Sequence, residues 1–409
     1  MKVRHALFAC LCLLAASISL PALGQTDPSF LLTGTAANFG SYFPSYLANG
    51  YFSTMTSPRG TEPNMGYMVA FMDYAKGDIS RPATIPGWSE IDYNPGGGWL
   101  NAIRLDPKIF ADYTQTLNMH DGTLSTGYRF DYANKSTDVQ VTTFVSQADP
   151  HLAATRLTIT PQFDGKVQLT FPFRLWSEHQ PRFPIATMTG DEMINAVIAS
   201  GQNLQNKPVP TPDRAAVWYP GHTRILASDG DAKQLLLWLD GQAEQGLHMA
   251  EAAAIGLPAG IKIDSATLEK GAYKLSLNLT VSVQKGKTYT FTKYIAASRQ
   301  DWGGDARADV KLAEAARDTG FERLLARHVA AWHALWQADI VIDGDPKVQQ
   351  AVHSDLYYLL SNTTVGTAWP MGACALTPGY AGHAFWDSDS WVFPALLLLH
   401  PQRAKPIVM

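Results

Sequence analysis

The chain has 409 residues, of which 46% are hydrophobic, 11% aromatic and only 17% charged. This length suits two or three domains with a sizeable core, and the apolar content excludes general disorder. The formal net charge is −4 and there is no run of basic residues. Nucleic acid is therefore excluded as a partner, because a phosphate-binding face needs clustered Lys and Arg. A low-charge, aromatic-rich chain is typical of exported β-rich proteins that handle neutral ligands.

Residues 1–24 have the pattern of a cleavable signal peptide. Two basic residues precede an apolar run from Ala6 to Leu20, and Pro21 and small residues follow. Cleavage near Gly24–Gln25 predicts a secreted or periplasmic protein. A membrane anchor is the alternative, but it needs about 20 unbroken apolar residues. Since Pro21 interrupts this run and no later segment is long enough, no membrane association is expected after cleavage.

The hydrophobic pattern from Leu31 to Ile295 has a period of mostly two, in short β-branched runs bounded by Asp, Gly or Pro. Many short strands with few helical stretches predict a large antiparallel sandwich over residues 25–300. The clearest predicted hairpin joins Tyr273–Val283 to Thr288–Ile295. Gly286 in the connection can supply the positive φ that such a turn needs.

After Arg299 the hydrophobic period changes to about 3.6, which predicts a helical connector over residues 301–340. Its apolar stripe consists of Phe321, Leu324, Leu325, His328, Trp332, Leu335 and Trp336. A strand-like piece follows at Asp339–Asp343. Asp345 and Pro346 then form a strong helix start, because Asp can cap free N–H groups and Pro suits the first helical position. Residues 341–409 are therefore predicted to form the beginning of an all-α region.

The segment from Gly379 to Pro394 carries the chemistry. It places a Trp beside a carboxylate, which is the usual way to hold a sugar: the indole packs on the apolar face of the ring and the carboxylate accepts hydroxyl hydrogen bonds. The candidate residues are His383, Trp386, Asp387 and Asp389, at a loop that leads into a helix near Asp389 or Ser390. The alternative is that Asp389 only caps this helix, while Trp386 and Trp391 are core aromatics.

The run Gly-His-Ala-Phe-Trp-Asp-Ser-Asp-Ser-Trp, ending at Trp391, closely resembles glycoside hydrolase family 65. The resemblance is strongest to its branch of acid trehalases, glucosylgalactosylhydroxylysine glucosidases and kojibiose hydrolases. Residues 328–360 also resemble this family, and weaker matches occur at Leu117–Gly122 and Phe144–His151. The resemblance implies an N-terminal β super-sandwich, a helical linker and the truncated start of an (α/α)6 barrel.

By this resemblance, Trp386 and Asp387 bind the glucose at the −1 position, and His383 and Asp389 support them. Family members cleave with inversion, using a carboxylic acid and, in hydrolases, a carboxylate that activates water. Both groups are expected beyond Met409, since only 65 residues follow Gly344 and twelve barrel helices need several hundred. No residue of this chain is therefore assigned a catalytic role. The chain is interpreted as a fragment that is inactive by itself.

The leading functional hypothesis is an α-glucosidase-type hydrolase that acts on an α-linked glucosyl disaccharide or glycoconjugate. The alternatives are a disaccharide phosphorylase of the same family and a non-catalytic carbohydrate-binding protein. No cofactor is expected, and His383 and His400 lack the spacing of a zinc site. The oligomeric state, a homodimer included, stays open. Two weaker candidate binding pairs, Glu178–His179 near Trp176 and Glu90–Asp92 near Trp88, are interpreted as loop or strand edge.

Overall fold

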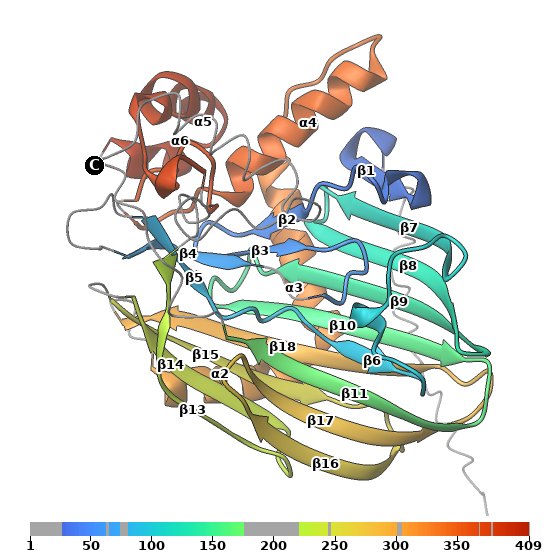
Figure 1. The fold of residues 1–409 in the computed structure, drawn as a ribbon. Helices are drawn as coiled ribbons and strands as arrows, with labels where there is room; N and C mark the ends of the chain where they lie inside the picture. Colours follow the sequence, from blue (N-terminus) through green and yellow to red (C-terminus); the bar gives the residue numbers. More distant parts are fainter. Residues whose placement is uncertain are drawn as a thin grey trace, which may run out of the picture.

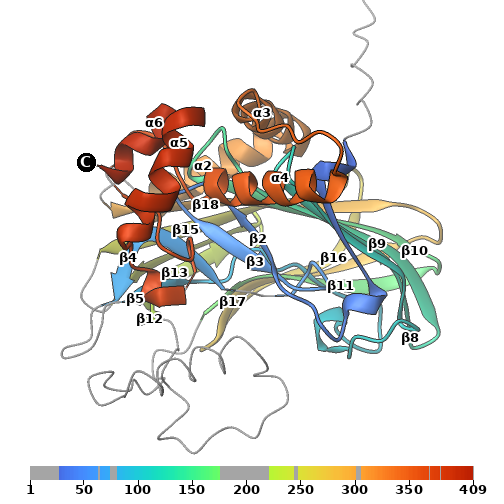
Figure 2. The ribbon, with the colours of Figure 1, turned by 90° about the horizontal axis from the view of Figure 1, so that it is seen from above.

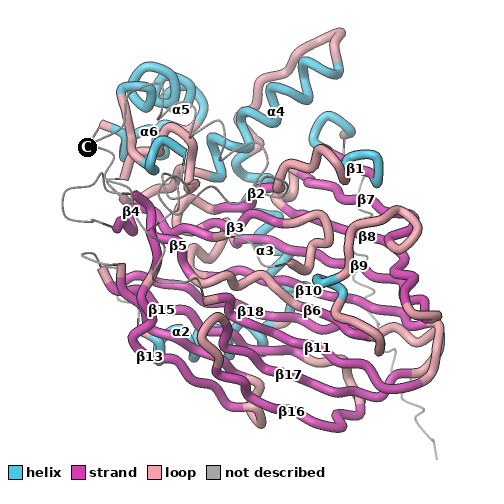
Figure 3. The backbone as a smooth tube through the Cα atoms, viewed as in Figure 1, coloured by secondary structure: helices cyan, strands magenta, loops and turns pink. Residues whose placement is uncertain are grey.

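The computed structural model describes residues 27–408, apart from 63–64, 74–80, 176–220, 244–246, 301–304, 368 and 378. The predicted signal peptide and the Glu178–His179 pair lie outside the described residues. Strands come first in the chain and helices follow (Figures 1 and 3). The strands are β1 (Leu31–Thr35), β2 (Ser45–Ala48), β3 (Ser53–Thr56), β4 (Gly66–Asp73), β5 (Arg81–Ile85), β6 (Asp92–Asn94), β7 (Phe110–Asn118), β8 (Thr123–Tyr132), β9 (Lys135–Val145), β10 (Leu152–Pro161), β11 (Gly165–Arg174), β12 (Gly221–His222), β13 (Arg224–Asp231), β14 (Leu236–Gln242), β15 (His248–Gly256), β16 (Lys262–Lys270), β17 (Lys274–Val283) and β18 (Tyr289–Arg299).

The predicted antiparallel sandwich is confirmed. A nine-stranded sheet has the order β1-β7-β8-β9-β10-β18-β15-β14-β13, and a four-stranded sheet has the order β16-β17-β11-β6. Their strand pairs are antiparallel, and smaller sheets of β12-β5-β4 and β2-β3 lie beside them. The hydrophobic period of two in the sequence corresponds to the two faces of the four-stranded sheet. On β11 and β17 the apolar side chains point into the shared core, and the alternate polar ones form the outer face.

The predicted hairpin between β17 and β18 is wrong. Both strands exist, but β17 pairs with β11 and β16, whereas β18 pairs with β10 and β15 in the other sheet. The connection through Gly286 therefore crosses from one sheet to the other, and Gly286 does have a positive φ of 73°. Alternation within each strand indicates only which face is buried. It does not select the partner, because both sheets present the same apolar inner face.

Lys293 connects the two sheets through the core. It lies on β18 of the large sheet and is fully buried, yet its ammonium group donates to Trp88 O at 2.6 Å and to Pro172 O on β11. Burial lowers the pKa of Lys293, and the nearby carboxylates of Glu90 and Glu251 oppose that shift. These hydrogen bonds stabilise a polar group that would otherwise be costly to bury.

Two helices cover the outer face of the nine-stranded sheet, as Figure 2 shows from above. They are α2 (Ala306–Thr319) and α3 (Phe321–Leu335). The sheet presents alanines to them, among which Ala252, Ala254 and Ala296 pack in one cluster with Ala313 of α2. Small side chains on both surfaces let a helix approach a sheet closely, which explains why α2 can lie flat there.

The predicted stripe on α3 is confirmed, since Phe321, Leu324, His328 and Trp332 are buried and Trp336 follows them. The predicted helix start is confirmed as well: α4 (Pro346–Ser361) is capped by the Asp345 carboxylate, which accepts from Lys347 N at 3.0 Å. Further α-helices among the described residues are α5 (Phe393–Leu399) and α6 (Pro401–Ala404). The (α/α)6 barrel stays a prediction.

The predicted strand at Asp339–Asp343 is wrong, because this segment has no strand partner in the described part of the chain. The side chain of Gln349 on α4 takes the place of a neighbouring strand. Its amide donates to Ile340 O at 3.0 Å and its carbonyl accepts from Ile342 N at 2.5 Å. Ile340 and Val341 are 42% and 75% exposed, so the apolar residues of this segment are not buried as they would be in a sheet, and hydropathy alone does not reveal this. Among the described residues, no helix is long and apolar enough to cross a bilayer.

Candidate functional site

The predicted sugar-binding residues lie on a short turn that precedes α5. A single turn of 3-10 helix (Gly379–Gly382) leads to His383, and a π-helical turn (Ser388–Val392) runs directly into α5. The Ser388 hydroxyl donates to Met371 O at 2.6 Å and thereby fixes the start of the π turn to the preceding loop. The predicted helix start near Asp389 therefore agrees with the structure to within a few residues.

The turn also rests on the sandwich. Gly382 has a φ of 66°, and a Cβ there would lie 2.2 Å from Pro82 Cγ on β5. Only glycine allows the backbone to approach this closely with a positive φ. The sandwich consequently holds the backbone of the turn in place immediately before the candidate residues.

The structure leaves the candidate Trp386 accessible, with 67% of its surface exposed. Trp391 is 70% exposed, so within this chain neither indole is a core aromatic. Asp387 occupies the N-cap position of the π turn and is half-buried, but its carboxylate makes no capping hydrogen bond. Asp389 is exposed in the first turn and His383 is half-buried. The four residues lie in the segment 383–389, and the Asp387 carboxylate does not cap the helical run that follows it.

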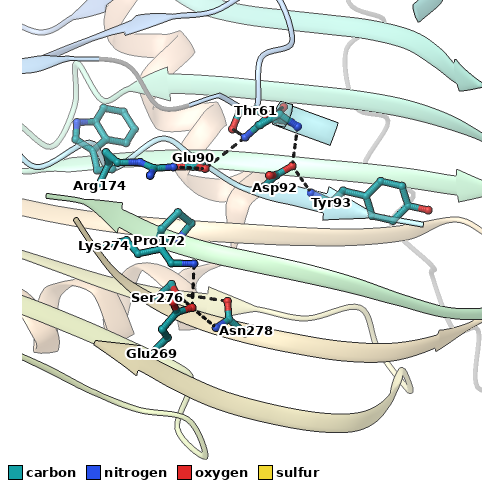
Figure 4. Close-up of polar contacts among 12 residues, drawn as sticks. Thr61, Glu90, Asp92, Tyr93, Pro172, Arg174, Glu269, Lys274, Ser276 and Asn278 are labelled. Atoms are coloured by element: carbon teal, nitrogen blue, oxygen red, sulfur yellow. Dashed lines mark hydrogen bonds and ion pairs between the residues drawn. The ribbon is translucent and has the colours of Figure 1, made fainter. Parts of the chain in front are cut away.

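A second candidate site is a hollow of about 820 Å³ on the outer face of the four-stranded sheet (Figure 4). Glu90 and Asp92 form one side of it, and Glu90 pairs with Arg174 on β11 at 3.2 Å. The Asp92 carboxylate accepts from Tyr93 N at 2.8 Å and from Asn101 N at 3.1 Å. Asp92 begins β6, the edge strand of this sheet, so the interpretation as strand edge is confirmed while its place in a hollow was missed.

The opposite side of the hollow carries a second charge pair. Lys274 and Glu269 approach to 2.9 Å, and Asn278 donates to Glu269 at 3.1 Å. Burial raises the pKa of Asp92 to about 7 and also raises that of Glu90, against the lowering effect of Arg174. Sequence alternation could have shown that these residues share the polar face of their strands. It could not show that β6, β11, β16 and β17 are neighbours.

The model of the N-terminal domain of glycosyl hydrolase family 65 matches residues 41–335, which is most of the chain.

The chain belongs to glycosyl hydrolase family 65.

Among its family 65 relatives, the kojibiose hydrolase of Flavobacterium johnsoniae is 39% identical over 396 residues, covering 94% of this chain and 51% of the relative. The α,α-trehalose phosphorylase of Thermoanaerobacter brockii is 26% identical, covering 89% of this chain and 46% of the relative. The acid trehalase of Emericella nidulans is 22% identical over 95% of this chain and 35% of the relative. The family 65 chain thus spans about half the length of the curated relatives it matches, or less.

A solved structure of a human-microbiome protein assigned as a kojibiose phosphorylase shares the fold, with a TM-score of 0.70 and 14% identity over 94% of this chain and 48% of the other. The resemblance to family 65 is therefore confirmed. Its relatives include both hydrolases and phosphorylases.

Proposed function

We propose that this chain is the N-terminal half of an exported, inverting family 65 hydrolase that cleaves an α-linked glucosyl disaccharide or glucosyl conjugate. In this proposal residues 25–300 are the sandwich, 301–340 the linker and 341–409 the first part of an (α/α)6 barrel. The sequence motif Phe-Trp-Asp-Ser-Asp-Ser-Trp, which begins at Phe385, favours hydrolysis over phosphorolysis. Phosphorylases of the family usually have Thr-Glu where this chain has Ser388 and Asp389. The 39% identity to a kojibiose hydrolase supports the same choice.

One observation carries the proposal: Trp386, whose indole is exposed to solvent, directly precedes in sequence an aspartate whose carboxylate makes no capping hydrogen bond. Trp386 can cover the apolar face of a glucose ring, and Asp387 can accept two of its hydroxyl groups. In this proposal His383 and Asp389, which flank the pair in sequence, support it. The catalytic acid and base belong to the rest of the barrel in this proposal.

The test uses a form of the protein that spans the full length of its relatives, with kojibiose as substrate. We expect Asp387→Asn to lower kcat/KM about 10- to 100-fold, because a hydrogen bond to a charged group contributes about 1.5–3 kcal/mol. The matched control is Asp318→Asn, which changes an exposed aspartate on α2 and should leave the rate unchanged. Equal rates for both variants would assign Asp387 a purely structural role.

The same form of the protein separates the two family chemistries. With kojibiose in phosphate buffer, the proposed hydrolase yields glucose alone, at a rate that does not depend on phosphate. A phosphorylase instead converts one glucosyl unit to glucose 1-phosphate and needs the anion for turnover. Phosphate-dependent release of glucose 1-phosphate would therefore replace hydrolysis by phosphorolysis in this proposal.

A further inference from the structure

Two histidines and an aspartate from distant parts of the chain converge where the sandwich meets α3. His120 and Asp121 lie in the turn between β7 and β8, and His333 lies near the end of α3. The Asp121 Oδ1 atom is 2.7 Å from His333 Nε2 and 3.3 Å from His120 Nδ1. One ligand atom from each residue can be chosen so that all three lie within 4.8 Å of one another.

From this convergence we infer a binding site for a divalent transition-metal ion, with Zn²⁺ as the best fit, at the joint between the sandwich and the linker helix. Two imidazoles and one carboxylate are a set of ligands that suits zinc rather than calcium or magnesium, which prefer oxygen. The side chains of His120, Asp121 and His333 are 31%, 20% and 40% exposed. Water can therefore reach the group and complete a four-coordinate shell.

The surroundings hold these ligands in place without a metal. The second carboxylate oxygen of Asp121 accepts from Asn118 Nδ2 at 2.8 Å, which orients the first oxygen toward the histidines. Such hydrogen bonds behind a ligand commonly fix its orientation in metal sites. A site whose ligands are already positioned loses little conformational entropy on binding.

The turn itself is fixed to α3 on both sides of the proposed ligands. Trp336 Nε1 donates to Met119 O at 3.0 Å, and His328 Nε2 lies 3.1 Å from Gly122 O. These contacts hold the β7–β8 turn in register with the helix that carries His333. A bound ion would add a link between two segments 212 residues apart in the chain and would stabilise the joint between sandwich and linker.

The test measures Zn²⁺ binding to the full chain, purified without a polyhistidine tag and stripped with EDTA. We expect titration calorimetry and metal analysis after dialysis to give about one Zn²⁺ per chain. His333→Ala should weaken the affinity at least 100-fold, and Asn118→Ala should weaken it about 10- to 100-fold. His248→Ala, which removes an exposed histidine on β15, is the matched control and should bind like the unaltered chain.

A second measurement on the unaltered chain does not depend on any variant folding. Co²⁺ in a four-coordinate site with histidine ligands absorbs visible light far more strongly than hydrated Co²⁺, and Zn²⁺ should abolish that absorption by displacement. Two results would overturn the inference: no such absorption, or equal Zn²⁺ affinity in the unaltered chain and in a folded His333→Ala chain. The three residues would then form a hydrogen-bonded group only.

Discussion

At the scale of single residues, Asp92 has an unusual charge state, because burial in the hollow raises its pKa from 3.8 to about 7. Between these values the folded chain holds a proton that the unfolded chain has lost. The contribution of Asp92 to the free energy of unfolding therefore falls as pH rises from about 4 to 7, and stays low above that. Asp92→Asn removes the cost of ionisation and keeps an oxygen that can accept from Tyr93 N and Asn101 N.

We expect Asp92→Asn to raise the free energy of unfolding by roughly 2–4 kcal/mol at pH 8 and to change it little at pH 4. Urea unfolding of both chains across this pH range gives the difference directly. Asp318→Asn serves as the exposed control and should show no such trend. A difference between the Asp92→Asn and unaltered chains that is constant with pH would mean that Asp92 titrates normally in the folded protein.

At the scale of elements, the contact between the β7–β8 turn and α3 depends on Gly122. Its φ is 65°, and a Cβ there would lie 1.9 Å from Trp332 Nε1, which belongs to a fully buried ring. We expect Gly122→Ala to lower the free energy of unfolding by roughly 2–5 kcal/mol, from backbone strain together with overpacking. Chemical denaturation followed by tryptophan fluorescence measures this loss.

Gly320 provides the matched control, since its φ is 85° but nothing lies within 4 Å of its Cβ position. Gly320, whose ψ is 150°, occupies a backbone region that is almost restricted to glycine, so Gly320→Ala carries the backbone strain alone and should cost about 1–3 kcal/mol. Equal losses at both glycines would show that the turn can move away from Trp332, and the close approach would then contribute nothing to stability.

Local pattern predicted individual elements well and their partners poorly. The stripe on α3 and the Asp345 cap follow from spacing within a few residues, and both were predicted correctly. One partner of each strand, β11 for β17 and β10 for β18, lies more than a hundred residues away in the chain, so a short Gly-containing connection looked like a hairpin. The contact between Asp121 and His333 could not be predicted for the same reason, because these residues become neighbours only when the sheet and α3 are assembled. Trp386 and Asp387 were instead selected from a short sequence motif, which can be recognised without knowing any long-range contact.

At the scale of the whole molecule, the C-terminal region leaves large apolar side chains uncovered. Trp391 and Leu398 are 70% and 85% exposed, and they are seven residues apart in a nearly continuous helical run, which places them close to one face. Soluble monomers rarely expose contiguous apolar patches beyond a few hundred Å², and such patches usually mark interfaces. In the proposed function this face packs against the rest of the barrel, so in the 409-residue chain it should drive association.

We expect the 409-residue chain to form concentration-dependent oligomers in sedimentation velocity, and the double substitution Trp391→Ser, Leu398→Ser to shift it toward monomer. The physical reason is that each large side chain removed from water stabilises association by about 1.5–3 kcal/mol. Phe43→Ser is the matched control, because Phe43 is 83% exposed but lies on the sandwich between β1 and β2, far along the chain from this face. If Phe43→Ser reduces association as much as the double substitution does, the contact is unspecific. If neither changes it, the exposed face near α5 is not an interface.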